Sequence, residues 1–167
     1  FPYTTLFRSD AIMTGNGGDH SVGTDVTIGA NATFKTSGSN TLSVGNDSTS
    51  IIDLGTHDLT LDASGGTISL IGKITGSGKI ITSGSGKVKL MATPGAGYSG
   101  SFELNTGEFS VQDAFGAANV VINGGTLKGS GSVGDVTLNS GSIAPGNSPG
   151  CLNTGDLSLT GGTYDVE

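Results

Sequence analysis

The stretch FELNTGEFSVQDAFGAANVVINGGTLKGSGSVGDVTL, residues 102–138, alternates short apolar triplets with glycine-rich connections. In triplets such as Phe102–Leu104 and Val136–Leu138, two apolar residues flank one polar residue. Side chains alternate between the two faces of an extended strand, so both outer residues of a triplet point the same way. The stretch therefore predicts short strands that are buried on one face and wet on the other.

The same triplet recurs along most of the chain. Its copies are Val26–Ile28, Leu42–Val44, Leu59–Leu61, Ile68–Leu70, Val88–Leu90, Phe102–Leu104, Phe109–Val111, Val120–Ile122, Val136–Leu138, Leu157–Leu159 and Tyr164–Val166. Gly-Gly, Asn-Gly and Ser-Gly pairs stand between them, and these residues tolerate the positive φ of tight turns. Only Val111–Val121, which contains Ala114, Phe115, Ala117 and Ala118, allows a short helical turn. We expect an all-β chain.

Composition distinguishes a folded chain from a disordered one. Gly accounts for 31 of the 167 residues, and Ser and Thr for 21 each. Disordered chains are poor in β-branched residues and rich in charge, whereas here only 13% of residues are charged. A sandwich of two sheets favours longer strands and more aromatic residues than the 5% present. We therefore predict a parallel β-helix, a solenoid with two or three short strands per coil.

Charge and cysteine content exclude several classes of partner. The net charge is −7, Arg8 is the single arginine, and six lysines are scattered from Lys35 to Lys128. Nucleic-acid and membrane surfaces require clustered basic residues, and a membrane helix requires about 20 apolar residues. Cys151 is the single cysteine, which rules out an internal disulfide or a cysteine-based zinc cluster. We expect no nucleic acid, no membrane insertion, no cofactor and no metal.

The two ends of the chain differ from its middle. Residues 1–9, FPYTTLFRS, resemble the translation of a widely used DNA-sequencing adapter and are interpreted as non-native. The last residues, 163–167, stop within an alternating pattern. We expect a single β-helix over residues 10–167, cut at both ends from a longer protein.

The C-terminal part carries a further set of motifs. They are ITGSGKI at 74–80, GSGKVKL at 84–90, YSG at 98–100, GEFSV at 107–111, NGGTLKGSGSVG at 123–134 and GSIAPGNSPG at 141–150. Together they resemble the autotransporter-associated β-strand repeat over roughly residues 68–167. Cys151 stands where that family often has Thr. The resemblance implies a right-handed parallel β-helix passenger domain on a bacterial cell surface, commonly an adhesin.

The same resemblance implies how such a segment is used. It implies export through a translocating β-barrel that lies outside this chain, and an extracellular location. Host or environmental glycans or surface proteins are the implied partners. An adhesin and a passive spacer remain equally open at the level of sequence.

Two short motifs match enzyme signatures without their structural context. Residues 129–134 satisfy GxGxxG, but a strand follows them rather than the helix that would receive a pyrophosphate. Residues 146–150 satisfy GxSxG, but Pro149 lacks the backbone N–H that the oxyanion hole needs. Both are interpreted as turns.

Asp53, His57, Asp58 and Asp62 form the one group with the chemistry of a hydrolytic site. If Asp58 and Asp62 share an outward face at a suitable separation, they provide the acid and base of a polysaccharide hydrolase. The simpler interpretation is that Asp53 and Asp58 cap turns while Asp62 faces solvent. We expect a non-enzymatic stalk or adhesin with no catalytic residues. The alternative is a β-helical hydrolase that uses Asp53, Asp58 and Asp62.

Overall fold

The computed structural model describes residues 5–8, 11–15, 17–23, 25–91, 97–116, 118–146 and 150–165. These residues form strands and turns without a helix. The strands are β1 (Thr5–Phe7), β2 (Ala11–Gly15), β3 (His20–Val22), β4 (Val26–Ile28), β5 (Ala32–Ser37), β6 (Thr41–Val44), β7 (Ile51–Asp53), β8 (Leu59–Ser64), β9 (Thr67–Leu70), β10 (Lys73–Thr75), β11 (Ile80–Ser83), β12 (Lys87–Leu90), β13 (Phe102–Leu104), β14 (Glu108–Val111), β15 (Val120–Ile122), β16 (Thr126–Gly129), β17 (Val136–Leu138), β18 (Ser142–Pro145), β19 (Leu157–Leu159) and β20 (Thr163–Tyr164). The all-β prediction is confirmed.

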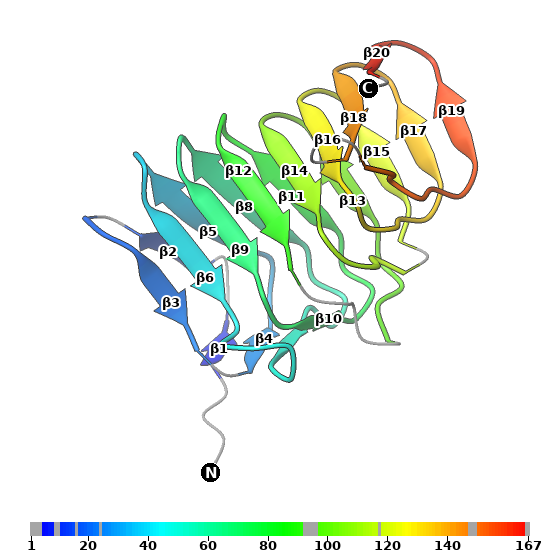
Figure 1. Cartoon of the computed structure of the whole chain (residues 1–167). Coiled ribbons are helices and arrows are strands. Elements are labelled where there is room, and N and C mark those ends of the chain that lie inside the picture. The colour runs from blue at the N-terminus through cyan, green and yellow to red at the C-terminus, as the bar shows by residue number, and fades with distance from the viewer. Residues whose placement is uncertain are drawn as a thin grey trace.

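Three sheets run along the molecule (Figure 1). The first sheet has the order β1-β4-β7-β10, the second β2-β5-β8-β11-β13-β15-β17-β19, and the third β3-β6-β9-β12-β14-β16-β18-β20. The chain visits the sheets in turn, and each strand pairs in parallel with its counterpart in the next coil. This is the architecture of a parallel β-solenoid, as predicted. Its right-handedness stays a prediction, which rests on the resemblance of the C-terminal motifs.

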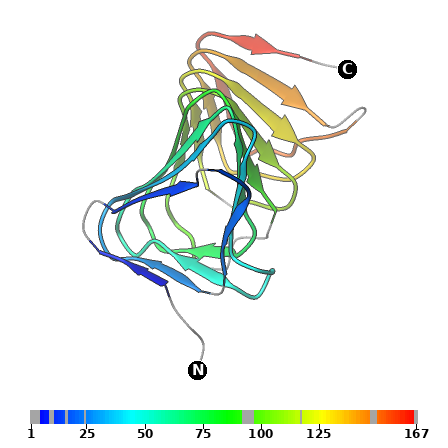
Figure 2. The ribbon, with the colours of Figure 1, turned by 90° about the vertical axis from the view of Figure 1, so that its left-hand side faces the viewer.

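The coils differ in length, and beyond β10 their described residues form strands in two sheets rather than three (Figure 2). Asn31 and Asp58 occupy equivalent positions 27 residues apart. Asn119 and Asp135 are equivalent positions only 16 residues apart. The first sheet ends at β10, and among the described residues the later coils place strands only in the second and third sheets.

The core is a set of apolar columns inside the coils. Val120, Ile122 and Leu127 are fully buried. The residues that alternate with them, Val121 in β15 and Lys128 in β16, lie on the outer face. Phe102 and Phe109 face each other across the two long sheets with their rings stacked 3.7 Å apart. The outer residues of the predicted triplets therefore point inward, as expected, from the first triplet to the one in β17.

The stretch from Val111 to Val121 is not helical in its described residues. Ala114 forms an isolated bridge with Ser132, and Phe115 is buried against the edges of the Phe102 and Phe109 rings. Ala117 lies outside the described residues. A turn does lie here, since Gly116 has φ +61° and the Ala118 N–H donates to the Phe115 carbonyl, but the described residues of the stretch form no helix.

Glycines occupy the corner that leads into the third sheet. Gly107, Gly125, Gly141 and Gly162 all have φ between 77° and 89°. A Cβ atom on Gly125 would lie 2.4 Å from the Gly107 carbonyl oxygen of the preceding coil. Only glycine fits such a position, because the left-handed conformation and the close stacking both exclude a side chain. The interpretation of the glycines as turns is confirmed here.

The fold includes part of the adapter-like segment. Residues Thr5–Phe7 form β1, which pairs in parallel with β4 at the edge of the first sheet. The Phe7 ring lies 5.0 Å from that of Phe34. At the other end Tyr164 lies in β20, and Val166 falls outside the described residues.

Candidate functional site

The structure separates the acidic residues that the hydrolase alternative requires. Asp53 ends β7 in the first sheet, whereas Asp62 lies within β8 in the second. Asp58 precedes β8, four residues before Asp62, and an extended chain separates such Cα atoms by about 13 Å. The two carboxyls of a glycoside hydrolase stand about 5–9.5 Å apart. The Asp58 carboxylate binds the Lys79 N–H of the next coil, whereas the Asp62 carboxylate binds Lys35 of the preceding coil, so the two are directed to opposite sides.

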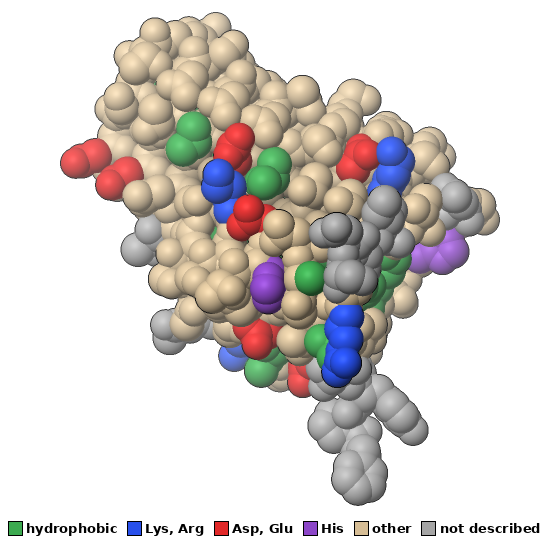
Figure 3. Space-filling model, turned by 180° about the vertical axis from the view of Figure 1, so that it is seen from behind, with side chains coloured by type: hydrophobic (Ala, Val, Ile, Leu, Met, Phe, Trp, Pro, Cys, Tyr) green, Lys and Arg blue, Asp and Glu red, His purple; other side chains and the backbone are tan. Residues whose placement is uncertain are grey.

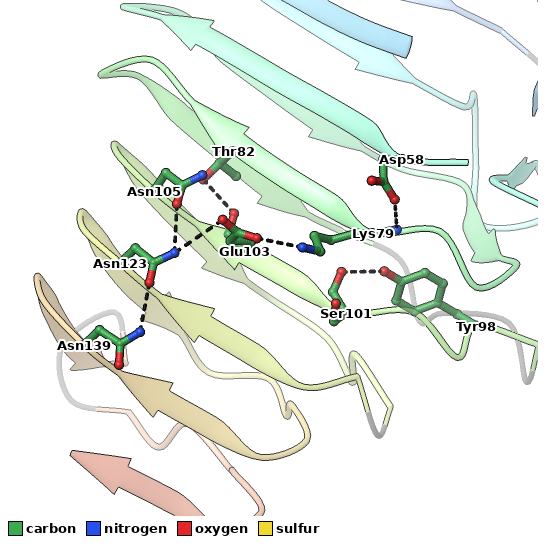
Figure 4. A network of polar contacts seen from close by, with 9 residues as sticks. All are labelled: Asp58, Lys79, Thr82, Tyr98, Ser101, Glu103, Asn105, Asn123 and Asn139. Carbon is green, nitrogen blue, oxygen red and sulfur yellow. Dashed lines mark hydrogen bonds and ion pairs between the residues drawn. The ribbon is translucent and has the colours of Figure 1, made fainter. Parts of the chain in front are cut away.

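Each of these aspartates has structural partners. Asp53 Oδ1 accepts hydrogen bonds from the Gly55 N–H at 2.9 Å and from the Thr75 hydroxyl at 3.3 Å. Asp58 Oδ1 accepts from the Lys79 N–H at 2.8 Å (Figure 4). The turn-capping interpretation is confirmed for Asp53, whereas Asp58 caps a backbone N–H of the next coil and not a turn of its own.

Asp62 lies on the outer face of the second sheet. Its carboxylate forms an ion pair with Lys35 Nζ at 2.8 Å and accepts a hydrogen bond from the Ser64 hydroxyl at 2.5 Å. The hydrogen bonds from Lys35 and Ser64 hold the pKa of Asp62 below its usual value. A general acid needs the opposite, a raised pKa, so this environment favours a surface carboxylate that is ionised at neutral pH.

The Asp58 contact belongs to a column that repeats along the stack. At the corner before the second sheet, a side-chain oxygen accepts the backbone N–H of the equivalent residue one coil later. Asn31 accepts from Asp58, Asn119 from Asp135, and Asp135 from Asp156. Two residues at other corners act in the same way, since Asp19 accepts from Thr41 and Asp25 from Ile51. The aspartates of this acidic chain are thus used largely as backbone caps.

A second polar column runs along the outer face of the second sheet (Figure 4). Asn123 Nδ2 donates to Asn105 Oδ1 at 3.0 Å, and Asn139 Nδ2 donates to Asn123 Oδ1 at 2.9 Å. Asn123 Nδ2 also lies 3.3 Å from Glu103 Oε1. We call the residues Asn105, Asn123 and Asn139 the asparagine ladder.

Sequence analysis did not find the asparagine ladder, although the signal is present. Its members follow consecutive strands of the second sheet, with separations of 18 and 16 residues. Those separations equal the coil lengths at this point, so the residues stack. Coil length becomes visible only once the strands have been assigned to sheets.

Glu103 joins the ladder to an ion pair with Lys79, whose Nζ lies 2.9 Å from Glu103 Oε2. The hydrogen bond between them lowers the pKa of Glu103 and raises that of Lys79, so both stay charged over a wide range of pH. Tyr98 braces the neighbouring corner, where its hydroxyl donates to the carbonyls of Gly78 and Ser101. Burial raises the pKa of Tyr98, which keeps the phenol protonated as a donor.

Figure 3 shows the face opposite to that of Figure 1. Basic and acidic side chains lie next to each other on it, and most of the surface is uncharged. Among the described residues, no group of three or more His, Cys, Asp or Glu side chains could hold a metal ion. In the same part of the chain, no helix is long and apolar enough to span a membrane.

The residues of the two enzyme-like motifs that the structure describes belong to strands and turns. Gly129 pairs with Val111, and a Cβ atom on it would lie 1.9 Å from the Val111 carbonyl oxygen. Strand β17 follows the GxGxxG motif, as expected from the sequence. In the PGNSPG element the Gly146 N–H donates to the Gly129 carbonyl, while residues 147–149 lie outside the described residues. Cys151 is exposed and carries a free thiol.

Comparisons with models of known protein families, with curated proteins and with solved structures found no match. The likeness to the autotransporter-associated repeat therefore rests on the motifs of the sequence.

Proposed function

We propose that this chain is a non-enzymatic segment of a bacterial surface passenger of the autotransporter type, acting as a stalk or adhesive rod. The observation that carries the proposal is the unbroken stacking of the second and third sheets, each with eight strands in parallel register. Each coil binds mainly its two neighbours, so such a stack extends in one dimension and suits a spacer between a cell and its surroundings.

The chemistry of the outer surface supports the same proposal. The four aspartates and asparagines that cap the corner before the second sheet bind backbone, and the asparagine ladder binds its own neighbours. Groups held in this way strengthen the cohesion between coils and are poorly placed for proton transfer. The motif resemblance adds the bacterial surface, the export through a separate barrel, and glycans or surface proteins as partners.

Export as a passenger tests the proposal directly. The chain is fused to a translocating outer-membrane barrel and compared with an Ile122→Asp variant, which places a charge in the fully buried core. The parent chain is expected to reach the cell surface, bind antibody on intact cells and resist added protease. The variant is expected to be digested. Retention of the parent chain inside the cell, or equal digestion of both, contradicts the proposal.

The non-enzymatic part of the proposal needs its own assay. The parent chain and an Asp58→Asn, Asp62→Asn variant are incubated with a panel of neutral and acidic polysaccharides, and new reducing ends are counted. Neither is expected to release any. Release by the parent chain alone favours the hydrolase instead.

A further inference from the structure

The outer face of the third sheet gathers lysines that lie far apart in the sequence. Lys87 and Lys89 lie on β12, Glu108 on the adjacent β14, and Lys128 on the next strand, β16 (Figure 1). Lys87 pairs in register with Glu108, while Lys89 and Lys128 flank Ser110 in one column. Half of the six lysines therefore lie on two strands of one sheet, β12 and β16, with only β14 between them. The view of the lysines as scattered is wrong for these three, because stacking of the coils brings them together. We call Lys87, Lys89 and Lys128 the lysine patch.

The charges of the lysine patch are only partly neutralised. Glu108 lies 3.4 Å from Lys87 Nζ and 3.3 Å from Lys128 Nζ, so one carboxylate serves two ammonium groups. Lys89 forms no ion pair or hydrogen bond with the described residues. Strands β6 to β18 of this sheet contain no acidic residue other than Glu108. Asp113, beyond the end of β14, directs Oδ1 to the Ala114 N–H at 2.7 Å.

The surroundings of the patch are polar. In register with Lys87, the preceding strand β9 presents Thr67, whereas Ser69, in register with Lys89, is buried. On the other side, the hydroxyls of Thr126 and Ser142 lie 2.9 Å apart. The face thus presents positive charge with hydroxyl groups on either side of it, in a protein whose net charge is −7.

We propose that the lysine patch binds a linear acidic polysaccharide, carboxylated or sulfated. Neighbouring strands lie about 4.8 Å apart, which spaces Lys89 and Lys128 by about 10 Å, and Lys87 lies about 7 Å from Lys89 along the strand. A small anion spans only part of such a patch, whereas a chain with an acidic group every sugar or two crosses it fully. The flanking hydroxyls complement the hydroxyls of the sugars.

The spacing and number of charges favour a polysaccharide over other polyanions. Duplex DNA carries one negative charge per about 1.7 Å, so an acidic protein with three local lysines gains little from it and is repelled elsewhere. Anionic membranes are bound by clusters of about four to eight basic residues. The inference rests on the proposed function only for the expectation that this face meets extracellular polymers.

Binding to immobilised heparin and alginate, measured at low and physiological salt, tests the patch. The variant Lys89→Gln, Lys128→Gln is compared with Lys73→Gln, which removes an exposed lysine of β10 on the first sheet. Each lysine lost from the patch is expected to weaken binding about fivefold, whereas Lys73→Gln leaves it unchanged. Glu108→Gln is expected to strengthen binding, because it releases Lys87 and Lys128 from their shared carboxylate.

Other outcomes overturn the inference. These are equal losses in the patch and Lys73 variants, weaker binding after Glu108→Gln, or tighter binding of duplex DNA or anionic vesicles than of either polysaccharide. The display experiment gives an independent answer. Surface display without polysaccharide binding overturns the lysine patch alone, and binding without display overturns the passenger role alone.

Discussion

Strands β17 and β19 follow the same pattern and are paired in register, yet their side chains meet different surroundings. Leu138 is 1% exposed, whereas Leu159, its partner one coil later, is 55% exposed. Val136 and Leu157 differ in the same way, at 1% and 41%. An inner coil is covered on both sides and the last coil on one side only. Alternation therefore determines which way a side chain points, while burial is supplied by the neighbouring coils.

Among the described residues, β19 and β20 are the terminal strands of the two long sheets, and Tyr164 on β20 is 44% exposed. An exposed strand edge with apolar side chains promotes pairing with other chains. In the two long sheets, the strands of the inner coils have no such edge because each is paired on both sides.

The largest expected difference between an inner coil and the last coil is the stability lost when an inward leucine is shortened. Leu138→Ala is expected to lower the free energy of unfolding by about 2–5 kcal/mol, because it leaves a cavity between packed coils. Leu159→Ala is expected to cost less than about 1 kcal/mol, since its side chain is already half in water. Urea unfolding monitored by circular dichroism measures both. Equal losses of unfolding free energy in the two variants would contradict this expectation, because they would mean that the last coil is as well covered as the inner ones.

Much of the fold can be predicted from the sequence because the controlling signal is local. Every triplet from Val26–Ile28 to Leu157–Leu159 lies in a strand. The triplet pattern missed strands whose inward positions hold small or polar residues. In β5 Ala32 faces inward, and in β11 the buried Thr82 stacks between Leu61 and Leu104.

The lysine patch and the asparagine ladder were harder to predict, because each depends on which residues of neighbouring coils stack on one another. Coil length varies from 16 to 27 residues, so no fixed period links Lys89 to Lys128 or Asn105 to Asn123. Asp58 shows the same limit. Its tendency to cap a turn was visible in its residue type, but its partner, the Lys79 N–H, lies 21 residues away.

The next largest difference is expected in the stability lost when a corner glycine is replaced by alanine. Gly125→Ala is expected to cost about 2 kcal/mol or more, because φ is +77° and the added Cβ would lie 2.4 Å from a carbonyl oxygen. Gly162→Ala places its Cβ 2.6 Å from the Gly141 oxygen, but the last coil can move away, so a smaller loss is expected. Gly38→Ala is the control, with φ +64° and nothing within 4 Å of its Cβ. A Gly38→Ala loss as large as that of Gly125→Ala would assign the whole cost to φ and none to stacking.

The backbone caps provide a contrast of about 1 kcal/mol. Asp58→Ala leaves the Lys79 N–H of an inner coil without its acceptor and is expected to cost about that amount. Asp135→Ala removes the acceptor of the Asp156 N–H in the last coil, where water replaces it, and is expected to cost less. Asp58→Asn keeps an acceptor oxygen, as Asn31 does naturally, and is expected to be neutral. Thermal unfolding at neutral pH compares the three variants. A loss in Asp58→Asn equal to that in Asp58→Ala would show that the negative charge is needed rather than the oxygen.

The smallest expected difference between the inner coils and the last coil is the stability that each loses at low pH. The ion pairs of the described residues join positions from Lys35 to Lys128, and none involves the last coil. Partners lower the pKa of Asp62 and Glu103 from usual values of 3.8 and 4.5. The stabilisation they give is therefore complete above those values and is lost as the pH falls below them. Exposed pairs contribute about 0–1 kcal/mol each, so the loss is small.

Amide hydrogen exchange at about pH 3 and about pH 6 locates this loss, after correction for the intrinsic exchange rates. Protection is expected to fall around β8, β11 and β13, which carry Asp62, Lys79 and Glu103 or adjoin them, and to change little in β19. The variant Asp62→Asn, Glu103→Gln should remove the difference between the two pH values in the inner coils. A fall confined to the last coil would contradict the assignment, because its open edge rather than the ion pairs would then control acid stability.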